Sequence, residues 1–392
     1  MKVLFINVTC GVGSTGRICT DIADMLISEG HECKIAYGRK IVPEKYKDIA
    51  YRIGSDFGVK VNGVKARLFD NEGFNARSAT KKLIKWIKHY NPDVIHLHNL
   101  HGYYLNVKLL FNYLKTCGKK VVWTLHDCWS FTGHCAYFDC PHCDKWQTEC
   151  GKCIRSKDYP KAIFSHAKRN FKRKKQIFCG VPNLTIVTPS KWLAELVKQS
   201  FLKEYPVQVI NNGIDLTVFK PTPSDFREKY GLQNKKVILG VANVWEKRKG
   251  FDDFLELAKL ISDDYRMVLV GVTDEQLKKL PPKVIGIKRT NSATELAQIY
   301  TAADVYVSPS REETFGMTVV EAMACGTPAI VYNATALPEI VNGYGFVCPN
   351  NKVDEIICCL NDKDFNFESN RVDIDNQYNK EKKYTAYINL YY

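Results

Sequence analysis

The sequence predicts an α/β chain built from two doubly wound domains, each with a parallel sheet covered by helices on both faces. Short apolar runs of strand length alternate with amphipathic stretches of helical period along the whole chain. Many of these runs are apolar throughout, which is typical of parallel strands buried on both faces. With 392 residues, 45% of them hydrophobic, the chain is long enough for two ordinary domains and too apolar to be disordered.

Eleven apolar runs are interpreted as strands. In chain order they span residues 3–8, 33–37, 94–98, 121–126, 184–188, 207–211, 237–241, 267–271, 284–287, 305–308 and 329–332. We assign the first five to an N-terminal domain and the other six to a C-terminal domain. Apolar residues at helical spacing fill the intervals, as in Ile18, Ile22, Met25 and Leu26.

The domain boundary is predicted near residues 203–206. This gives an N-terminal domain of residues 1–205, with a cysteine-rich insert at about 128–153, and a C-terminal domain of residues 206–375. Residues 362–375 are polar and loop-like, and residues 376–392 form a terminal helix. Tyr384, Tyr387 and Tyr391 recur at three- and four-residue spacing, so we expect this helix to dock on the first domain.

The chain is strongly basic, with 56 Lys and Arg against 42 Asp and Glu and a net charge of +14. Such a charge suggests an anionic partner: a nucleic acid, a phosphorylated ligand or an acidic lipid surface. The densest basic run lies within residues 164–178, where Phe164, Phe171 and Phe178 recur every seven residues. Two interpretations stay open: a helix on an anionic membrane surface, and a solvated helix with its phenylalanines packed inward.

The location expected from the sequence is cytoplasmic, at most peripheral at the inner face of the membrane. No apolar run reaches the length of a membrane span, and the first residues carry no small-residue cleavage site.

A glycine loop of Gly11, Gly13 and Gly16 follows the first strand and opens the first helix. Formally this is the dinucleotide-binding pattern. However, the second strand ends in Tyr37-Gly38-Arg39 with no acidic residue, so the loop would at most suit a dinucleotide with a 2′-phosphate, such as NADP. Alternatively, the glycines leave room for an acceptor molecule.

Residues 308–328 join a buried strand to a helix and place two carboxylates eight positions apart, Glu313 in the loop and Glu321 in the helix. Gly316 allows a ligand close to the backbone, and the free N–H groups of the helix start can hold an anion. Paired carboxylates suit a hydroxyl-rich ligand, because each can accept hydrogen bonds from adjacent hydroxyls. The alternative is an ordinary strand-loop-helix unit with two surface acids.

A second loop with charged residues follows the strand at 237–241. Arg248 and Lys249 precede Gly250 at the start of a helix, where two positive charges can face a diphosphate. The alternative is a basic loop on a basic protein.

Taken in order, these motifs resemble retaining glycosyltransferases of the GT-B fold, and above all family 4, which serves bacterial capsular and exopolysaccharide synthesis. The motifs that carry the resemblance are Asn212-Gly213-Ile214-Asp215, Arg248-Lys249-Gly250, Ser308-Pro309-Ser310 with Glu313 and Glu321, Leu337-Pro338-Glu339-Ile340-Val341, and Gly345-Phe346-Val347. The resemblance implies two Rossmann-like domains facing across a cleft. It also implies transfer of a sugar from a UDP- or GDP-sugar to a glycan or polyprenyl-linked acceptor.

The resemblance also implies roles for individual residues. Lys249 would contact the diphosphate, Glu313 the donor sugar and Glu321 the nucleotide ribose, while His126, at the end of a strand, would lie near the reacting sugar. The implied catalytic residues are His126, Lys249 and Glu313. The implied donor-binding residues are Gly13, Asn243, Arg248, Lys249, Glu313, Phe315, Gly316, Met317, Thr318 and Glu321, and Gly16 and Asp127 lie on the acceptor side.

In the implied mechanism the leaving diphosphate helps to deprotonate the acceptor on the same face, and no metal or other cofactor is required for catalysis. One position departs from the family pattern. Family members carry an arginine shortly before the lysine, where this chain has Asn243. Arg248 is the residue we expect to supply the missing charge.

Six of the fifteen cysteines follow His126 closely, and Cys140, Cys143, Cys150 and Cys153 form two Cys-x2-Cys pairs. Such pairs can hold a structural zinc ion, with His134 and His142 as spare ligands. Reduced structural thiols and a loop disulfide remain open as alternatives, although a cytosolic setting disfavours disulfides.

Two other functions compete with glycosyl transfer. The glycine loop and Arg39 would suit an NADP-binding enzyme, and the charge and cysteines would suit a zinc-containing nucleic-acid-binding protein. No nucleic-acid-binding module is recognisable in the sequence, so we expect no nucleic-acid partner.

Overall fold

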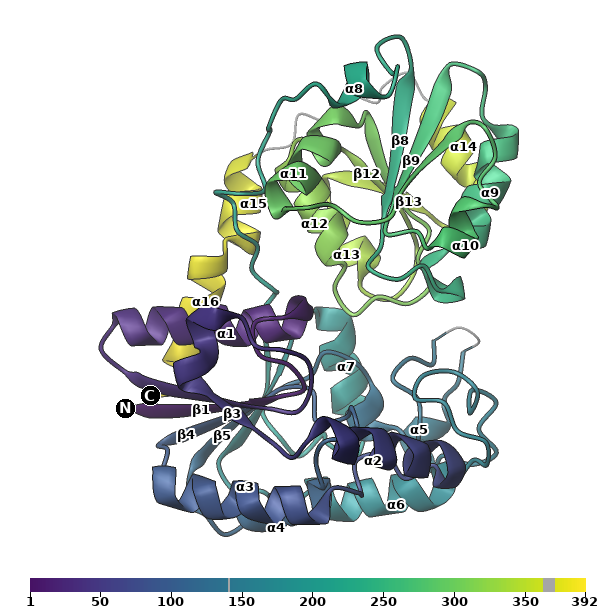
Figure 1. Ribbon diagram of the computed structural model, residues 1–392. Helices are drawn as coiled ribbons and strands as arrows, with labels where there is room; N and C mark the ends of the chain where they lie inside the picture. Colours follow the sequence, from purple (N-terminus) through teal and green to yellow (C-terminus); the bar gives the residue numbers. More distant parts are fainter. Residues whose placement is uncertain (140–141, 362–370) are drawn as a thin grey trace. The chain divides into compact units, whose positions relative to one another are not determined.

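The computed structural model describes residues 1–139, 142–361 and 371–392, with side chains omitted for 371–373. These residues form two compact units, one of Met1–Ile210 with Tyr384–Tyr392 and the other of Asn211–Lys383. Each unit contains one sheet in which every described strand pair is parallel, and helices lie on both sides of each sheet (Figure 1). The predicted α/β class with two doubly wound sheets is therefore confirmed.

The first unit has a seven-stranded sheet in the order β3-β2-β1-β4-β5-β6-β7. The strands are β1 Lys2–Asn7, β2 Glu32–Tyr37, β3 Ala50–Arg52, β4 Val94–Leu97, β5 Lys120–Thr124, β6 Leu184–Thr188 and β7 Val207–Val209. The helices are α1 Gly13–Ser28, α2 Asp56–Phe69, α3 Arg77–Tyr90, α4 Val107–Leu114, α5 Lys145–Thr148, α6 Ala167–Phe178 and α7 Lys191–Gln199, with 3₁₀ turns at η1 Glu44–Ile49 and η2 Trp129–Phe131.

The second unit has a six-stranded sheet in the order β10-β9-β8-β11-β12-β13. The strands are β8 Lys236–Val241, β9 Tyr265–Val270, β10 Val284–Ile287, β11 Val305–Ser308, β12 Ala329–Tyr332 and β13 Gly345–Cys348. The helices are α8 Phe226–Lys229, α9 Phe251–Leu260, α10 Asp274–Leu277, α11 Ala293–Ala302, α12 Met317–Ala324, α13 Leu337–Val341, α14 Val353–Asn361 and α15 Arg371–Tyr378, with a 3₁₀ turn at η3 Lys247–Lys249.

Each sheet separates two hydrophobic cores, because alternate residues of a strand point to opposite faces. In β1, Val3 and Phe5 belong to one core, while Leu4 and Ile6 belong to the other, and all four are fully buried. In Figure 1, α1 lies on one side of this sheet and α3 and α4 lie on the other. Burial on both faces explains why these runs are apolar throughout.

The structure corrects three details of the predicted organisation. Val207–Val209 pairs with β6 and so belongs to the first unit, and the boundary falls after Ile210. The short edge strands β3 and β13 were not predicted. Residues 371–375, predicted as loop, form part of α15, while residues 362–370 of that prediction lie outside the described residues.

The last helix, α16 Lys380–Asn389, returns the end of the chain to the first unit, as predicted. Tyr384, Tyr387 and Tyr391 are buried in the same core as α1, confirming the tyrosine stripe. Tyr391 Oη also lies 2.6 Å from Nδ1 of the buried His96 on β4.

We predict that Tyr391→Phe destabilises the protein by about 1–3 kcal/mol, because a buried imidazole nitrogen loses its partner. Urea unfolding of the full chain measures the loss. Tyr392→Phe is the matched control: this neighbour is exposed and bonds His31 at the surface, so its removal should change stability by at most about 0.5 kcal/mol. Equal effects of the two substitutions would contradict the assignment of Tyr391 to the core.

Candidate functional site

In the second unit, the loops that follow β8 and β11 bring Lys249 and Glu313 into contact. β8 and β11 are neighbours in the sheet, so their carboxyl ends open at the same edge. Lys249 Nζ and Glu313 Oε1 form an ion pair in which both side chains are largely buried. Two residues predicted to serve one ligand are thus side by side.

Close packing of the two loops explains this contact. Gly250 adopts a φ of +74°, and a Cβ at this position would lie 2.5 Å from the carbonyl oxygen of Pro309. Only glycine fits both constraints. The backbone N–H of Arg311 also donates to the carbonyl of Arg248 at 2.8 Å, which fixes the register of the loops.

The β11 loop is further held by a buried carboxylate. Asp253 on α9 accepts two hydrogen bonds from Arg311, at 2.7 and 2.8 Å, and one from Tyr332 at 2.9 Å. A bidentate arginine–carboxylate pair fixes direction as well as distance. The sequence analysis did not predict a role for Asp253, Arg311 or Tyr332. The available signal was Asp253 itself, an acidic residue two positions after Gly250-Phe251.

The charge state of Glu313 follows from its neighbours. Burial alone would raise the pKa of this carboxyl, but the positive charges of Lys249 and Arg248 outweigh it, and the pKa is lowered. Arg248 lies beside this loop, donating from Nη1 to the carbonyl of Glu312 at 3.0 Å. Glu313 is therefore an acceptor-only group at neutral pH.

Glu321 is a second carboxylate at this edge. It lies in α12, is 7% exposed, and accepts a hydrogen bond from Tyr300 Oη at 3.0 Å. Burial raises the pKa of Tyr306, and the charges of Glu313 and Glu321 add to the effect, so both carboxylates lie within electrostatic reach of one tyrosine.

The other predicted donor-binding residues fall into two groups. The first group is accessible to a ligand. Gly316, at φ +99°, precedes α12, and Met317 and Thr318 in the first turn of that helix are half-buried. Asn243 is exposed in the loop after β8. In contrast, Phe315 is 2% exposed and packs against Tyr378, so its side chain belongs to the core and only its backbone is available to a ligand.

In the first unit, His126 follows β5 and lies against a histidine that follows β4. His126 Nε2 is 3.0 Å from His98 Nδ1, and the two rings stack. Burial lowers the pKa of His126 to about 4 and lowers that of His98 as well, so both imidazoles are neutral at physiological pH. The sequence signal for the second histidine was His96-Leu97-His98 at the end of an apolar strand.

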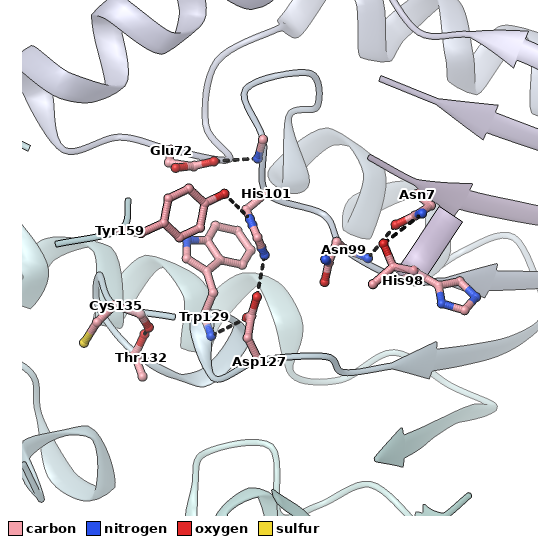
Figure 2. Close-up of polar contacts among 12 residues, drawn as sticks. Asn7, Glu72, His98, Asn99, His101, Asp127, Trp129, Thr132, Cys135 and Tyr159 are labelled. Atoms are coloured by element: carbon pink, nitrogen blue, oxygen red, sulfur yellow. Dashed lines mark hydrogen bonds and ion pairs between the residues drawn. The ribbon is translucent and has the colours of Figure 1, made fainter. Parts of the chain in front are cut away.

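Asp127 belongs to a buried polar network centred on His101 (Figure 2). His101 Nε2 is 2.7 Å from Asp127 Oδ2, and its Nδ1 is 2.9 Å from Tyr159 Oη. Burial alone would lower the pKa of His101, but the charge of Asp127 and the hydrogen bond to it raise it overall. Trp129 N–H donates to the other oxygen of Asp127 at 2.9 Å, so this carboxylate is fully engaged within the unit.

The predicted glycine loop is only partly open. Gly13, with φ +73° at the start of α1, has open space where a Cβ would stand. Gly16 is buried, and a Cβ there would lie 2.6 Å from Thr9 Oγ1. Gly16 thus allows α1 to pack closely on the loop that follows β1, and its contact with an acceptor stays a prediction.

Three of the four predicted zinc ligands lie within the described residues. Cys140 lies outside the described residues, while Cys143, Cys150 and Cys153 surround a small cavity together with Cys135. Across residues 1–139, 142–361 and 371–392, no three His, Cys, Asp or Glu side chains are already arranged to hold one metal ion.

The basic helix α6 packs its phenylalanines inward. Phe171 and Phe178 are buried in the core, which confirms for these two residues the interpretation of a helix with its phenylalanines packed inward. Phe164 precedes the helix and is 64% exposed. Lys174 is also fully buried, 2.6 Å from the carbonyl of Trp129 and over its ring, and burial lowers its pKa to about 7. Among the described helices, none is long and apolar enough to cross a membrane.

Two family models match this chain. Residues 15–218 match the model of Glycosyltransferase Family 4, and residues 224–362 match that of Glycosyl transferases group 1. The first match alone covers more than half of the chain.

Two of the curated relatives match this chain over most of their length. A protein of Escherichia coli provisionally assigned to colanic acid biosynthesis as the glycosyl transferase WcaC is 24% identical over 363 residues, which cover 88% of this chain and 86% of WcaC. An uncharacterized glycosyltransferase of Methanocaldococcus jannaschii is 27% identical over 97% of this chain and 94% of its own.

Solved structures agree on the fold. Sucrose-phosphate synthase of Thermosynechococcus elongatus superposes with a TM-score of 0.71 at 17% identity, covering 100% of this chain and 98% of its own. HepE of Anabaena, solved in complex with UDP and glucose, gives 0.68 at 17% identity, covering 99% and 98%. These neighbours are GT-B glycosyltransferases, so the predicted GT-B architecture is confirmed.

We predict that the first unit loses stability as the pH falls below about 6.5, the pKa of an unfolded histidine. His96, His98 and His126 have lowered pKa values in the folded unit. Below about pH 6.5 these histidines are therefore protonated in the unfolded chain and still neutral in the folded unit, down to about pH 4 for His126. Each contributes up to about 1.4 kcal/mol per pH unit.

Urea unfolding at a series of pH values measures this slope. His126→Gln should make it shallower, whereas His142→Gln, at an exposed position, should leave it unchanged. A stability independent of pH between 7 and 5 would contradict neutral, buried imidazoles.

Proposed function

The chain belongs to glycosyltransferase family 4, and we propose that it transfers a sugar from a UDP- or GDP-sugar to a glycan or polyprenyl-linked acceptor in polysaccharide biosynthesis. It is a glycosyltransferase by family, and its relative WcaC is provisionally assigned to colanic acid biosynthesis. We further propose that the anomeric configuration of the donor is retained and that catalysis needs no metal ion.

The observation that carries the proposal is the contact of Lys249 with Glu313 at the carboxyl edge of the second sheet. In open α/β sheets this edge is where phosphorylated ligands bind. HepE, which has the same fold, was solved with UDP and glucose, which supports a nucleotide-sugar as the donor. Donor binding is therefore assigned to the second unit.

On binding, the donor would break the ion pair and interact with both Lys249 and Glu313. The diphosphate attracts Lys249 Nζ, with Arg248 as a second cation, and Glu313 then accepts hydrogen bonds from sugar hydroxyls. In this proposal Glu321, which accepts a hydrogen bond from Tyr300, also accepts from the two ribose hydroxyls. Asn243, where the family has arginine, leaves Arg248 as the compensating charge.

Retention fits a mechanism in which the leaving diphosphate accepts the acceptor's proton on the face from which it departs. Fixed positive charges then stabilise the oxygen that gains charge as the glycosidic bond breaks. Lys249 and Arg248 supply those charges without a divalent ion. We propose that the acceptor binds the first unit, where the neutral His126 would serve as a hydrogen-bonding partner for a hydroxyl and not as a fixed charge.

We predict that Lys249→Ala lowers kcat/KM by roughly 100- to 1,000-fold, as for other groups that stabilise developing charge. Lys247→Ala is the matched control: it is exposed in the same 3₁₀ turn and should stay within about twofold. The assay measures release of the nucleotide, which reports both hydrolysis and transfer of the sugar. It uses a lipid-linked acceptor fraction and is run with and without added Mg²⁺ or Mn²⁺.

Thermal-shift measurements with UDP, GDP and NADP identify the nucleotide class. Stabilisation by UDP or GDP that is lost in Glu321→Ala supports the assignment, and stabilisation by NADP alone would overturn it. The anomeric configuration of the product, read by NMR, tests retention separately.

We also propose that the first unit contacts an anionic membrane, through residues other than α6. Helix α2 exposes Phe57, Val64, Leu68 and Phe69, and the neighbouring Ile163 and Phe164 are 64% exposed. Ile163 N–H donates to the carbonyl of Arg67 at 2.7 Å, which places this loop against the end of α2. Exposed lysines and arginines interleave with these apolar groups, as is typical of interfacial helices.

We predict that the double substitution Phe69→Ser with Phe164→Ser weakens binding to phosphatidylglycerol vesicles roughly tenfold or more, since each buried phenylalanine contributes about 1.5–3 kcal/mol. Vesicle sedimentation measures binding, with zwitterionic vesicles as the reference. Val244→Ser, at an exposed apolar residue of the second unit, should bind like the unchanged protein. Equal binding of all three proteins would contradict the proposal that this surface binds an anionic membrane.

A further inference from the structure

The insert that follows β5 encloses a small cavity with sulfur on several sides. Cys135, Cys143, Cys150 and Cys153 all line it, and none of the four is in a disulfide. The cavity volume is about 30 Å³, enough for a water-sized guest and too little for a sugar or a nucleotide. The cavity therefore suits a single ion.

The sulfur atoms are already in polar contacts with one another and with the backbone. The N–H of Gly133 donates to Cys150 Sγ at 3.2 Å, and the thiols of Cys135 and Cys153 hydrogen-bond to each other. Backbone donors of this kind orient a thiolate and disperse its charge when it binds a metal.

An imidazole with an unused nitrogen lines the same cavity. His134 is 2% exposed, and its Nδ1 lies 2.6 Å from Oδ1 of the buried Asp70. Its Nε2 finds no hydrogen-bond partner among the described residues. A buried nitrogen of this kind costs free energy unless the cavity supplies a partner. A metal ion can bind the bare nitrogen, and a metal-bound thiolate can accept from Nε2 when the ring carries a second proton.

The insert also has a structural need for a cross-link. Its regular structure is limited to η2 and the four-residue α5, although Phe131, Phe138 and Trp146 are buried in the core of the first unit. Segments with so little regular structure are commonly held by a structural metal.

We propose that Cys135, Cys143, Cys150 and Cys153 bind one structural zinc ion. Four thiolates in a tetrahedral arrangement select zinc or an iron–sulfur centre, and the cavity is too small for a cluster. On binding, the thiols lose their protons to solvent and four Zn–S bonds form. This set replaces Cys140 of the sequence-based prediction by Cys135, and it is independent of the glycosyltransferase activity.

Among the described residues, these side chains do not yet form a group that could hold a metal ion, and the thiols of Cys135 and Cys153 interact with each other instead. A change of χ1 rotamer re-aims a cysteine sulfur without moving its backbone. Zinc binding would therefore exchange the thiol–thiol hydrogen bond for metal–sulfur bonds within the existing loop.

The test is the metal content of the full-length chain, purified without a histidine tag and measured by inductively coupled plasma mass spectrometry. We expect one zinc per chain, released in step with modification of thiols by an organomercurial. Replacement by Co²⁺ should give the sulfur-to-cobalt charge-transfer and d–d absorption of a tetrahedral thiolate site. No zinc, or a disulfide within the insert found by non-reducing peptide mapping, would overturn the proposal.

Variants identify the ligands. Cys135→Ser should lose the zinc, while Cys140→Ser and Cys117→Ser, a half-buried cysteine of the same unit, should keep it. Retention in Cys135→Ser with loss in Cys140→Ser would overturn the ligand set. If Cys135→Ser fails to fold, Cys153→His replaces it: a His ligand should keep one metal and weaken the charge-transfer band by one thiolate, and an unchanged band would exclude Cys153.

Discussion

The organisation of this protein depends on one constraint: neighbouring strands in both sheets are parallel. Parallel strands all end at the same edge, so loops far apart in sequence are gathered at that edge. In the second unit this constraint brings Arg248 and Lys249, after β8, against Glu313, after β11. In the first unit it places His98, after β4, against His126, after β5.

The two edges differ in electrostatics, and the difference suits a division of labour. The second unit presents charges that neutralise each other without a ligand, Lys249 and Arg248 around an ionised Glu313. The first unit presents the neutral imidazoles of His98 and His126, followed by Asp127, which is hydrogen-bonded to His101. A charged diphosphate suits the former, whereas an uncharged hydroxyl suits the latter.

Most of the fold was predictable, because a buried parallel strand is an uninterrupted apolar run. β3 and β13 were missed because edge strands of three and four residues, only partly buried, carry a weak apolar signal. Lys249, Glu313 and Glu321 were predictable from their motifs. The network of His101, Asp127 and Tyr159 was not, since hydrogen bonds across 58 positions leave no local pattern. The same holds for Lys174, which a basic run suggests is solvated and which the structure buries under Trp129.

The return of α16 to the first unit has a consequence for how the chain is made. Domains usually fold in order as they leave the ribosome, the N-terminal one first. Here one wall of the first unit's core, with Tyr384, Tyr387 and Tyr391, is synthesised after the whole of the second unit. Until those residues emerge, the part of the core that they fill, including the imidazole of His96, stays uncovered. The nascent first domain is therefore incompletely folded, and able to bind chaperones, while more than 170 residues of the second unit are translated.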